Sequence, residues 1–179
     1  QGLTYGLLRQ SKKNNHSAHA DLFDTAEILS EVVNHSKQKF LKSYSPIQKR
    51  SAIGNNYQQL EYACHFATFL LDNVGDVPDP SDLYALTTQT LDAFEQKFRP
   101  EIILLKALYR FLKTEGFPID SGWWQSLTNE NKSRAKILLT TPLANFKDSP
   151  DLESAITLHK LLCQWAHKET ELKIKAISL

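Results

Sequence analysis

The stretch KQKFLKSYSPIQKRSAIGNNYQQLEYACHFATFLL, residues 37–71, decides the fold because its hydrophobic period changes once along its length. Before Arg50, bulky and polar residues alternate with a period of two, as in a β-strand. After Arg50, apolar residues recur three and four positions apart, which is typical of an amphipathic helix: Tyr57, Leu60, Cys64, Ala67 and Leu71. We therefore expect a β module over residues 1–50 and a helical domain over residues 51–179.

Two segments upstream of this stretch also alternate and predict strands, one over residues 3–7 and one over residues 23–33. The turn-forming run SKKNNHS separates them, and Pro46 is expected to end the third strand. Three strands in so short a segment indicate a small antiparallel β-barrel. Because the chain opens on Gln1 and contains no methionine, we expect this barrel to be incomplete here.

Downstream, the pattern remains helical to the end of the chain. Helices are expected from Pro80 to about residue 98, from Pro100 to a left-handed stop at Gly116, over residues 131–140, and from Pro150 past residue 165. In the helix after Pro100, apolar residues recur three and four positions apart, which predicts its buried face: Ile102, Leu105, Leu108 and Leu112. The expected fold class is thus α+β, with the strands first and the helices after them.

Charge is unevenly distributed, with a net of +4 over residues 1–50 and −3 over the rest. A basic front indicates a module that binds anions. Lysines and arginines on loops neutralise phosphates, and aromatic side chains beside them can stack on bases. The alternative is that the two aromatic residues of the third strand, Phe40 and Tyr44, belong to the core and that the lysines are only solvated. By alternation, Phe40, Lys42 and Tyr44 are expected on one face of this strand.

No phosphate-binding glycine loop, nucleophile elbow, zinc-protease helix or dinucleotide fingerprint occurs, so we predict a protein that is not an enzyme and carries no cofactor. His159, Cys163 and His167 share one helix face, but eight residues of helix rise about 12 Å. The outer two therefore cannot both reach one metal ion, and packing is the expected role. A metal-dependent enzyme built on these residues remains a third hypothesis. Cys64 and Cys163 are both predicted to be buried, inert thiols.

The pair Trp123 and Trp124 predicts one side chain that seals the helical core and another that could anchor a partner protein. No apolar run is long enough to cross a bilayer, and no signal peptide opens the chain. The expected location is the cytoplasm.

The order of these features resembles the RecO family of DNA repair and recombination mediators. The resemblance rests on GLTYGLLRQSKKNNHSAHADLFDTAEILSEV and KQKFLKSYSPIQKR in the β module. It continues in the helical segments YQQLEYACHFATFLL, PDPSDLYALTTQTLDAF and FRPEIILLKALYRFLKTEGF, and more loosely in the final helix. The resemblance is based on the order and spacing of these segments, since none of the motifs is diagnostic alone. Two departures concern GFPIDSGWW, which lacks the four zinc-binding cysteines of many members, and Gln10, which replaces a usual glycine.

The resemblance implies an N-terminal oligonucleotide-binding (OB) barrel followed by a helical domain, in a bacterial, nucleoid-associated protein. It implies binding to single- and double-stranded DNA, annealing of complementary strands, and loading of recombinase together with RecR. It also implies contact with the acidic C-terminal tail of single-strand-binding protein, and no zinc in this chain. The DNA-contact role falls first on Arg9, Lys12 and Lys13, and more weakly on Lys37, Lys39 and Lys42. The alternative is a helical protein–protein adaptor that does not bind nucleic acid.

Overall fold

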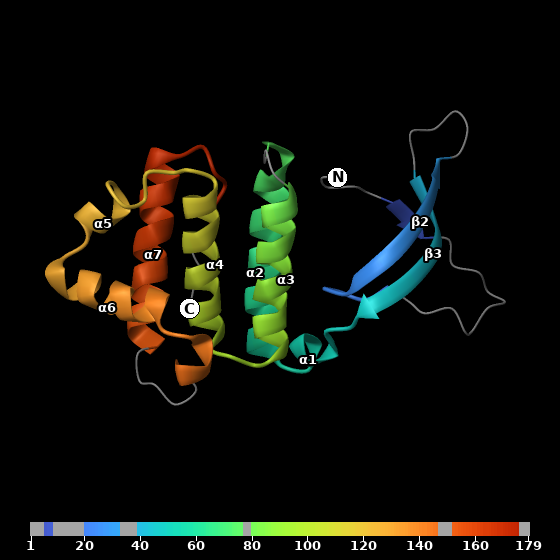
Figure 1. The fold of residues 1–179 in the computed structure, drawn as a ribbon, viewed down its shortest axis with the longest axis horizontal. Coiled ribbons are helices and arrows are strands. Elements are labelled where there is room, and N and C mark those ends of the chain that lie inside the picture. The colour runs from blue at the N-terminus through green and yellow to red at the C-terminus, as the bar shows by residue number, and fades with distance from the viewer. Residues whose placement is uncertain (1–5, 9–19, 33–38, 77–79, 147–151, 176–179) are drawn as a thin grey trace. The chain divides into compact units, whose positions relative to one another are not determined.

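The computed structural model describes residues 6–8, 20–32, 39–76, 80–146 and 152–175. It divides into two compact units, Gln1–Ser51 and Ala52–Leu179, and each is described here by itself. The first unit contains the strands and the second contains the helices (Figure 1). The protein is therefore a mixed α+β chain that is mostly helical. The period change at Arg50 falls beside this division.

The first unit holds a three-stranded sheet in the order β1-β3-β2, formed by β1 (Gly6–Leu8), β2 (Thr25–Val32) and β3 (Lys39–Gln48). The central strand β3 is antiparallel to β2, as expected, but parallel to β1. The purely antiparallel sheet predicted from the sequence is wrong, because the chain reverses twice between β1 and β3 and these two strands pair directly. Within the described residues the sheet is open and does not close into a barrel.

A bulge in β3 changes which side chains share a face of the sheet. Leu29 pairs with Ser43 but the next residue of β2, Ser30, pairs with Leu41, so Lys42 is the extra residue. As a result Phe40 lies opposite Glu31 and Tyr44 lies opposite Ile28. Glu31 and Ile28 are three positions apart on β2 and therefore point to opposite faces. The expectation that Phe40 and Tyr44 share a face is wrong, because one inserted residue reverses the alternation.

The strand β3 also runs past Pro46, where the sequence predicted its end. Proline lacks the N–H that a ladder needs, and the pairing of β2 with β3 shifts register a second time between Thr25 and Ala26, beside Pro46. Such an irregularity lets the strand continue to Gln48. The sheet is therefore longer and more bent than a regular hairpin.

The buried side chain of Arg50 fastens the end of β3 to the start of β2. Its guanidinium donates to the backbone oxygen of Phe23 at 2.7 Å, to Thr25 Oγ1 at 2.8 Å and to Gln48 Oε1 at 3.2 Å. Phe23 has a φ of +66°, a left-handed conformation that costs about 1–2 kcal/mol for a residue other than glycine. The Asp24 carboxylate accepts from the Tyr44 hydroxyl and from the Arg50 backbone N–H. This network fixes the backbone of one end of the sheet.

The second unit begins with the single turn α1 (Ser51–Gly54). It then contains α2 (Tyr57–Asn73), α3 (Pro80–Glu95), α4 (Pro100–Thr114), α5 (Trp123–Ser126), α6 (Asn129–Thr140) and α7 (Leu152–Glu169). Two short 3-10 turns, η1 (Val74–Asp76) and η2 (Leu143–Phe146), follow α2 and α6. The Asn56 side chain caps α2 by accepting from the Gln59 N–H, and α4 starts on Pro100. Gly116, with φ +78°, lies just after α4 as predicted.

Helix α4 forms the centre of the helical unit. It contacts α2, α3, α6 and α7, and Figure 1 shows it between α7 and the pair α2–α3. The predicted core face of α4 is confirmed, since Ile102, Leu105, Leu108 and Leu112 are all buried. At this length and composition no helix among the described residues could cross a membrane.

The predicted core face of α2 is wrong. Tyr57 is 79% exposed, Leu71 is 52% exposed, and Cys64 between them is also exposed. The buried side chains lie on another face: Gln59, Tyr62, Ala63, Phe66 and Phe69. The ring of Phe69 meets that of Phe111 edge-on, with centroids 4.9 Å apart. Two apolar faces compete on this helix, and the one with the larger aromatic rings is buried because it removes more apolar area from water.

The tandem tryptophans occupy different environments. Trp123 is fully buried, as predicted for the side chain that seals the core, and its ring meets those of Tyr109 and Trp124. Trp124 is half-buried and its Nε1 donates to the Tyr109 hydroxyl at 3.2 Å. The preceding Gly122 is required by packing, since a Cβ there would lie 2.7 Å from Nε1 of Trp165.

Candidate functional site

Of the six lysines and arginines expected to contact DNA, only two fall in the part of the chain that the structure describes. Lys39 and Lys42 lie on β3, whereas Arg9, Lys12, Lys13 and Lys37 lie outside the described residues. Lys39 begins the strand and pairs with Gly6 on one side and Val32 on the other. The structure therefore brings two of the six into one strand.

Lys42 has an acidic neighbour in the sheet. Its ammonium lies 2.9 Å from the Glu31 carboxylate, and about half of each side chain is exposed. An exposed pair of this kind contributes at most about 1 kcal/mol and is screened by salt. A phosphate can therefore replace the carboxylate at little cost. Because Glu31 shares a face with Phe40, the ammonium of Lys42 lies near that ring's side of the sheet.

The opposite face of the sheet also carries exposed apolar side chains. Ile28 is 60% exposed and Val32 is 58% exposed, and both share a face with Tyr44. Lys39 pairs with Val32 and lies on this face as well, whereas the exposed Leu29 lies on the face of Glu31. The sheet therefore carries Phe40 and Lys42 on one face and Tyr44 and Lys39 on the other.

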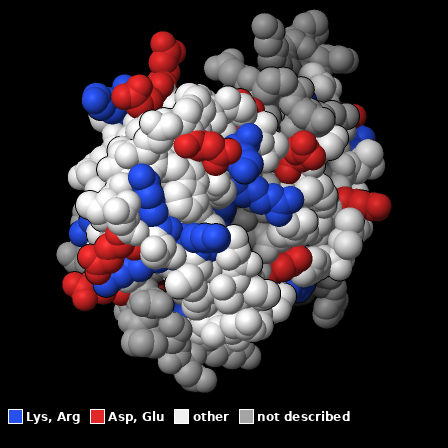
Figure 2. All heavy atoms as spheres, turned by 60° about the vertical axis from the view of Figure 1, so that its left-hand side comes forward, with Lys and Arg blue, Asp and Glu red and all other residues white. Residues whose placement is uncertain are grey.

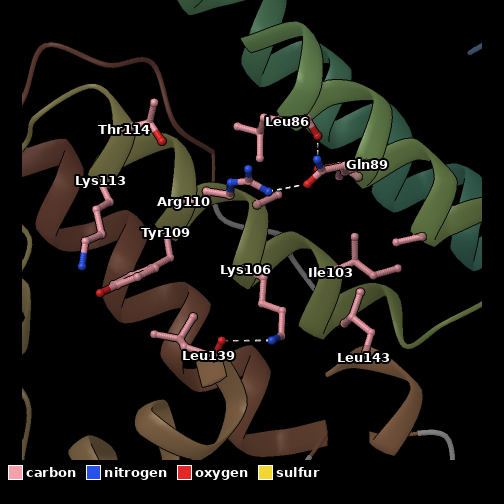
Figure 3. Close-up of a pocket in the computed structure, with 13 residues that line it drawn as sticks. Leu86, Gln89, Ile103, Lys106, Tyr109, Arg110, Lys113, Thr114, Leu139 and Leu143 are labelled. Carbon is pink, nitrogen blue, oxygen red and sulfur yellow. Dashed lines mark hydrogen bonds between the residues drawn. The ribbon is translucent and has the colours of Figure 1, made fainter. Parts of the chain in front are cut away.

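A second candidate site is a cavity of about 430 Å³ in the helical unit, lined by α3, α4, α6 and η2. Its apolar wall is formed by Leu86, Ala93, Ile103, Ala107, Leu139 and Leu143. The volume lies in the usual range of small-molecule and peptide-anchor pockets. Figure 3 shows that the lining side chains of α3 and α4 face one another across this cavity. We call it the α3–α4 pocket.

Three cationic side chains of one helix line the α3–α4 pocket. Lys106, Arg110 and Lys113 are spaced four and three residues apart, so they lie along one face of α4. Among the lining residues that the structure describes there is no aspartate or glutamate. Figure 2 shows lysine and arginine side chains gathered near the centre of one face of the molecule. An apolar wall with a cationic border is suited to a ligand that combines an anionic group with an apolar one.

Lys106 forms the inner end of this row. Its Nζ donates to the backbone oxygens of Leu139 at 3.1 Å and Thr141 at 2.7 Å, which ties α4 to the end of α6. Burial lowers the pKa of Lys106, since the surrounding apolar wall disfavours its charge. An ammonium group has three donors, so two carbonyl partners leave it the capacity to bind an anion as well.

Arg110 and Lys113 are more accessible. An Nη of Arg110 donates to Gln89 Oε1 on α3, a neutral partner that leaves the positive charge uncompensated by this contact. Lys113 lies 3.5 Å from the Asp120 carboxylate in a pair that is mostly exposed and therefore weak. The guanidinium can bind a carboxylate through two parallel hydrogen bonds. The row thus offers the planar guanidinium of Arg110 and the ammonium of Lys113 to an anionic ligand.

Sequence reasoning did not identify the α3–α4 pocket, although part of its signal is visible. The segment KALYRFLK places three basic residues on one helical face. That pattern alone is usually a solvated surface. The apolar wall combines residues of α4 itself with residues of α3, α6 and η2, so only the tertiary structure turns the row into a site.

Of the three residues expected to pack rather than to bind a metal, two are packed in the core. His159 and Cys163 are both buried, with the sulfur 3.6 Å from Nε2, while His167 is exposed. Burial raises the pKa of the Cys163 thiol to about 12, so it stays protonated and unreactive. No group of three possible ligands gathers in the described part of the chain. Cys64 departs from the prediction, because it lies on the exposed face of α2.

Comparison with known protein families, curated proteins and solved structures finds no match to this chain. Its function is therefore argued from the sheet and the α3–α4 pocket themselves.

Proposed function

We propose that this protein is a DNA-binding recombination mediator of the RecO kind. It binds single- and double-stranded DNA through its β unit, anneals complementary strands, and acts with RecR to load recombinase onto DNA coated by single-strand-binding protein. The observation that carries this proposal is the α3–α4 pocket, with three cations, an apolar wall and no carboxylate among its described lining residues. A mediator needs such a site because it must engage a protein partner as well as DNA.

The pocket suits the acidic C-terminal tail of single-strand-binding protein. A tail of this type carries several carboxylates, including the terminal one, and Arg110 and Lys113 can bind carboxylates at the opening. An apolar side chain near the end of the tail would enter the cavity beside Leu139 and Leu143. The apolar contact supplies affinity, and the charges supply specificity and a fast association rate.

The β unit supplies the DNA contacts in this proposal. Residues 1–50 carry a net charge of +4, and annealing requires only that this charge screens the repulsion between two phosphate backbones. We propose that the open sheet is part of an OB barrel, whose face with Lys42 and Phe40 meets the DNA. The helical part would then limit retention on the duplex product, since residues 51–179 carry a net charge of −3.

The DNA-binding part is tested by fluorescence anisotropy with a labelled single-stranded oligonucleotide across a salt series. The logarithm of the affinity should fall linearly with the logarithm of the salt concentration. Alanine replacement of Arg9, Lys12 and Lys13 together should reduce the slope by about two units, since each lost contact with a single strand removes about 0.7. The matched control replaces three exposed lysines of the helical unit, Lys136, Lys160 and Lys168, and should leave the slope unchanged.

Either of two results would contradict the DNA-binding part of the proposal. One is the absence of binding at low salt, and the other is an equal loss of slope in both triple variants. The second result would mean that DNA is held by overall charge and not by the β unit.

The tail-binding part is tested separately with an acidic peptide that ends in an apolar residue. Arg110→Glu should weaken its binding about tenfold or more, because it replaces an attractive charge in the α3–α4 pocket by a repulsive one. Lys136→Glu makes the same charge change on the exposed face of α6, outside the pocket, and should change the affinity less than about twofold. Isothermal titration calorimetry measures both. Equal effects of the two variants would show that the pocket is not the site.

The adaptor hypothesis keeps one supporting observation. The exposed face of α2, with Tyr57, Cys64 and Leu71, together with the exposed Tyr84 of α3, offers apolar surface for a protein partner. An interface centred on Trp123 is wrong, because that side chain is fully buried. The adaptor hypothesis requires that the salt series detect no DNA binding at all.

A further inference from the structure

The residues that follow α7 turn back and lie along α2. Asn73 holds them in place: its Nδ2 donates to the backbone oxygen of Lys173 at 3.1 Å, and its Oδ1 accepts from the backbone N–H of Lys173 at 2.8 Å. These two bonds join positions one hundred residues apart. At the other end, Leu172 N–H donates to Thr170 Oγ1 at 3.2 Å. We call residues 170–175 the C-terminal strap.

The C-terminal strap covers a small cavity of about 20 Å³ that contains two histidines. Ile174 and Lys175 of the strap lie on one side, His65 comes from α2 and His159 comes from α7. The rest of the lining is apolar: Phe66, Phe69, Leu104 and Leu108. His159 is buried and has Cys163 as its polar neighbour. The cavity therefore offers little to stabilise an imidazolium ion at His159.

The charged groups around this cavity favour a neutral His159. The strap contributes Lys173 and Lys175, which would repel an imidazolium ion. On α2, Asp72 lines the adjoining surface beside His65 and is the one carboxylate among the lining residues that the structure describes. Helix α4 contributes only leucines to the lining, and α7 contributes His159 alone. Burial, followed by the charge of His65, lowers the pKa of His159 to about 4.

We propose that the C-terminal strap is an acid-operated latch, which stays closed over α2 and α7 while His159 is neutral and is released when His159 is protonated. An imidazolium ion at His159 would repel Lys175 of the strap, which lines the same cavity. Release lets water reach the charged ring and uncovers the aromatic and leucine side chains beneath. In the part of the chain that the structure describes, the hydrogen bonds that hold the strap to α2 are those to Asn73, so the cost of opening is low compared with unfolding α4. The proposal does not depend on DNA binding.

The sign of the pH dependence follows from the depressed pKa of His159. The closed state binds fewer protons than the open state, whose histidine has the ordinary value of 6.5. Acid therefore favours the open state, and the effect grows as the pH falls from 6.5 toward about 4. At pH 7 both states are neutral at this residue and the strap is closed.

The experiment follows backbone amides of the full chain by NMR hydrogen exchange at pH 7 and at pH 4.5, corrected for the intrinsic rate. The protection of the Lys173 amide should fall about tenfold or more at pH 4.5, while the amides of α4 keep theirs. In the variant H159Q, which cannot gain this charge, Lys173 should be equally protected at both pH values. Asn73→Ala should expose the Lys173 amide at both pH values, which identifies the open state.

Three results would overturn the latch. Lys173 could stay protected at pH 4.5 in the unchanged protein. Lys173 and the amides of α4 could lose protection together, which would indicate global acid unfolding. The H159Q variant could also open in acid as the unchanged protein does, which would assign the effect to other groups.

Discussion

Replacing Trp123 by alanine is expected to lower the free energy of unfolding of the helical unit by about 3–5 kcal/mol. Its side chain is fully buried and lies against the rings of Tyr109 and Trp124. Truncation removes this packing and leaves a cavity that the neighbouring rings cannot fill. Urea denaturation followed by circular dichroism at the helical signal measures the change.

Trp124→Ala is the matched control, because it makes the same truncation one residue away. This side chain is half-buried and has one hydrogen bond, to Tyr109. Its loss should cost about 1–2 kcal/mol, clearly less than the loss at Trp123. Equal losses at the two positions would contradict the assignment of Trp123 as the residue that seals the core. A Trp124 variant that folds normally but loses a protein partner would support the anchor role predicted from the sequence.

Replacing Arg50 by methionine should destabilise the β unit by about 2–4 kcal/mol. Methionine keeps much of the volume but removes the donors to Phe23 O, Thr25 Oγ1 and Gln48 Oε1. The Phe23 carbonyl then loses the bond that helps to hold this residue in its left-handed conformation. The expected result is fraying of the end of the sheet where β2 begins and β3 ends.

The three tryptophans allow the two units to be followed separately, because all of them lie in the helical unit. In the Arg50 variant, the NMR signals of Thr25 and Tyr44 should lose dispersion at a lower urea concentration, while the tryptophan fluorescence transition stays in place. Lys49→Met is the control, since Lys49 is exposed and its replacement should change stability by less than about 0.5 kcal/mol. A shift of the fluorescence transition, or equal effects at Lys49 and Arg50, would show that Arg50 does not act through the sheet.

Part of the candidate site could be predicted from the sequence, and part could not. The basic residues of the front were visible as local charge, and two of them, Lys39 and Lys42, lie together on β3. The sequence did not predict that Phe40 and Tyr44 lie on opposite faces of the sheet, with Lys42 on the side of Phe40. The bulge that causes this leaves no trace in the alternation of residues. The α3–α4 pocket was also missed, since its walls come from segments that are up to 57 residues apart, from Leu86 to Leu143.

The sequence by itself determined the change from strands to helices beside Arg50, the start of α4 at Pro100 and the left-handed residue Gly116 after it. These features follow from local chemistry: the period of side chains in a strand or helix, the fixed φ of proline and the freedom of glycine. It also determined that Ile102, Leu105, Leu108 and Leu112 of α4 are buried, although the structure buries α4 on other sides as well, including Ile103 and Leu104.

Only the tertiary structure decided which face of α2 is buried, that β1 runs parallel to β3, and where the basic row of α4 meets an apolar wall. Helix α2 has two faces that are apolar enough to be buried, and the choice depends on which rings fit against Phe111 of α4. Strand direction likewise depends on which strands pair, and not on the residues of any one strand. In each case several local solutions have similar free energies, and contacts between distant segments select one of them.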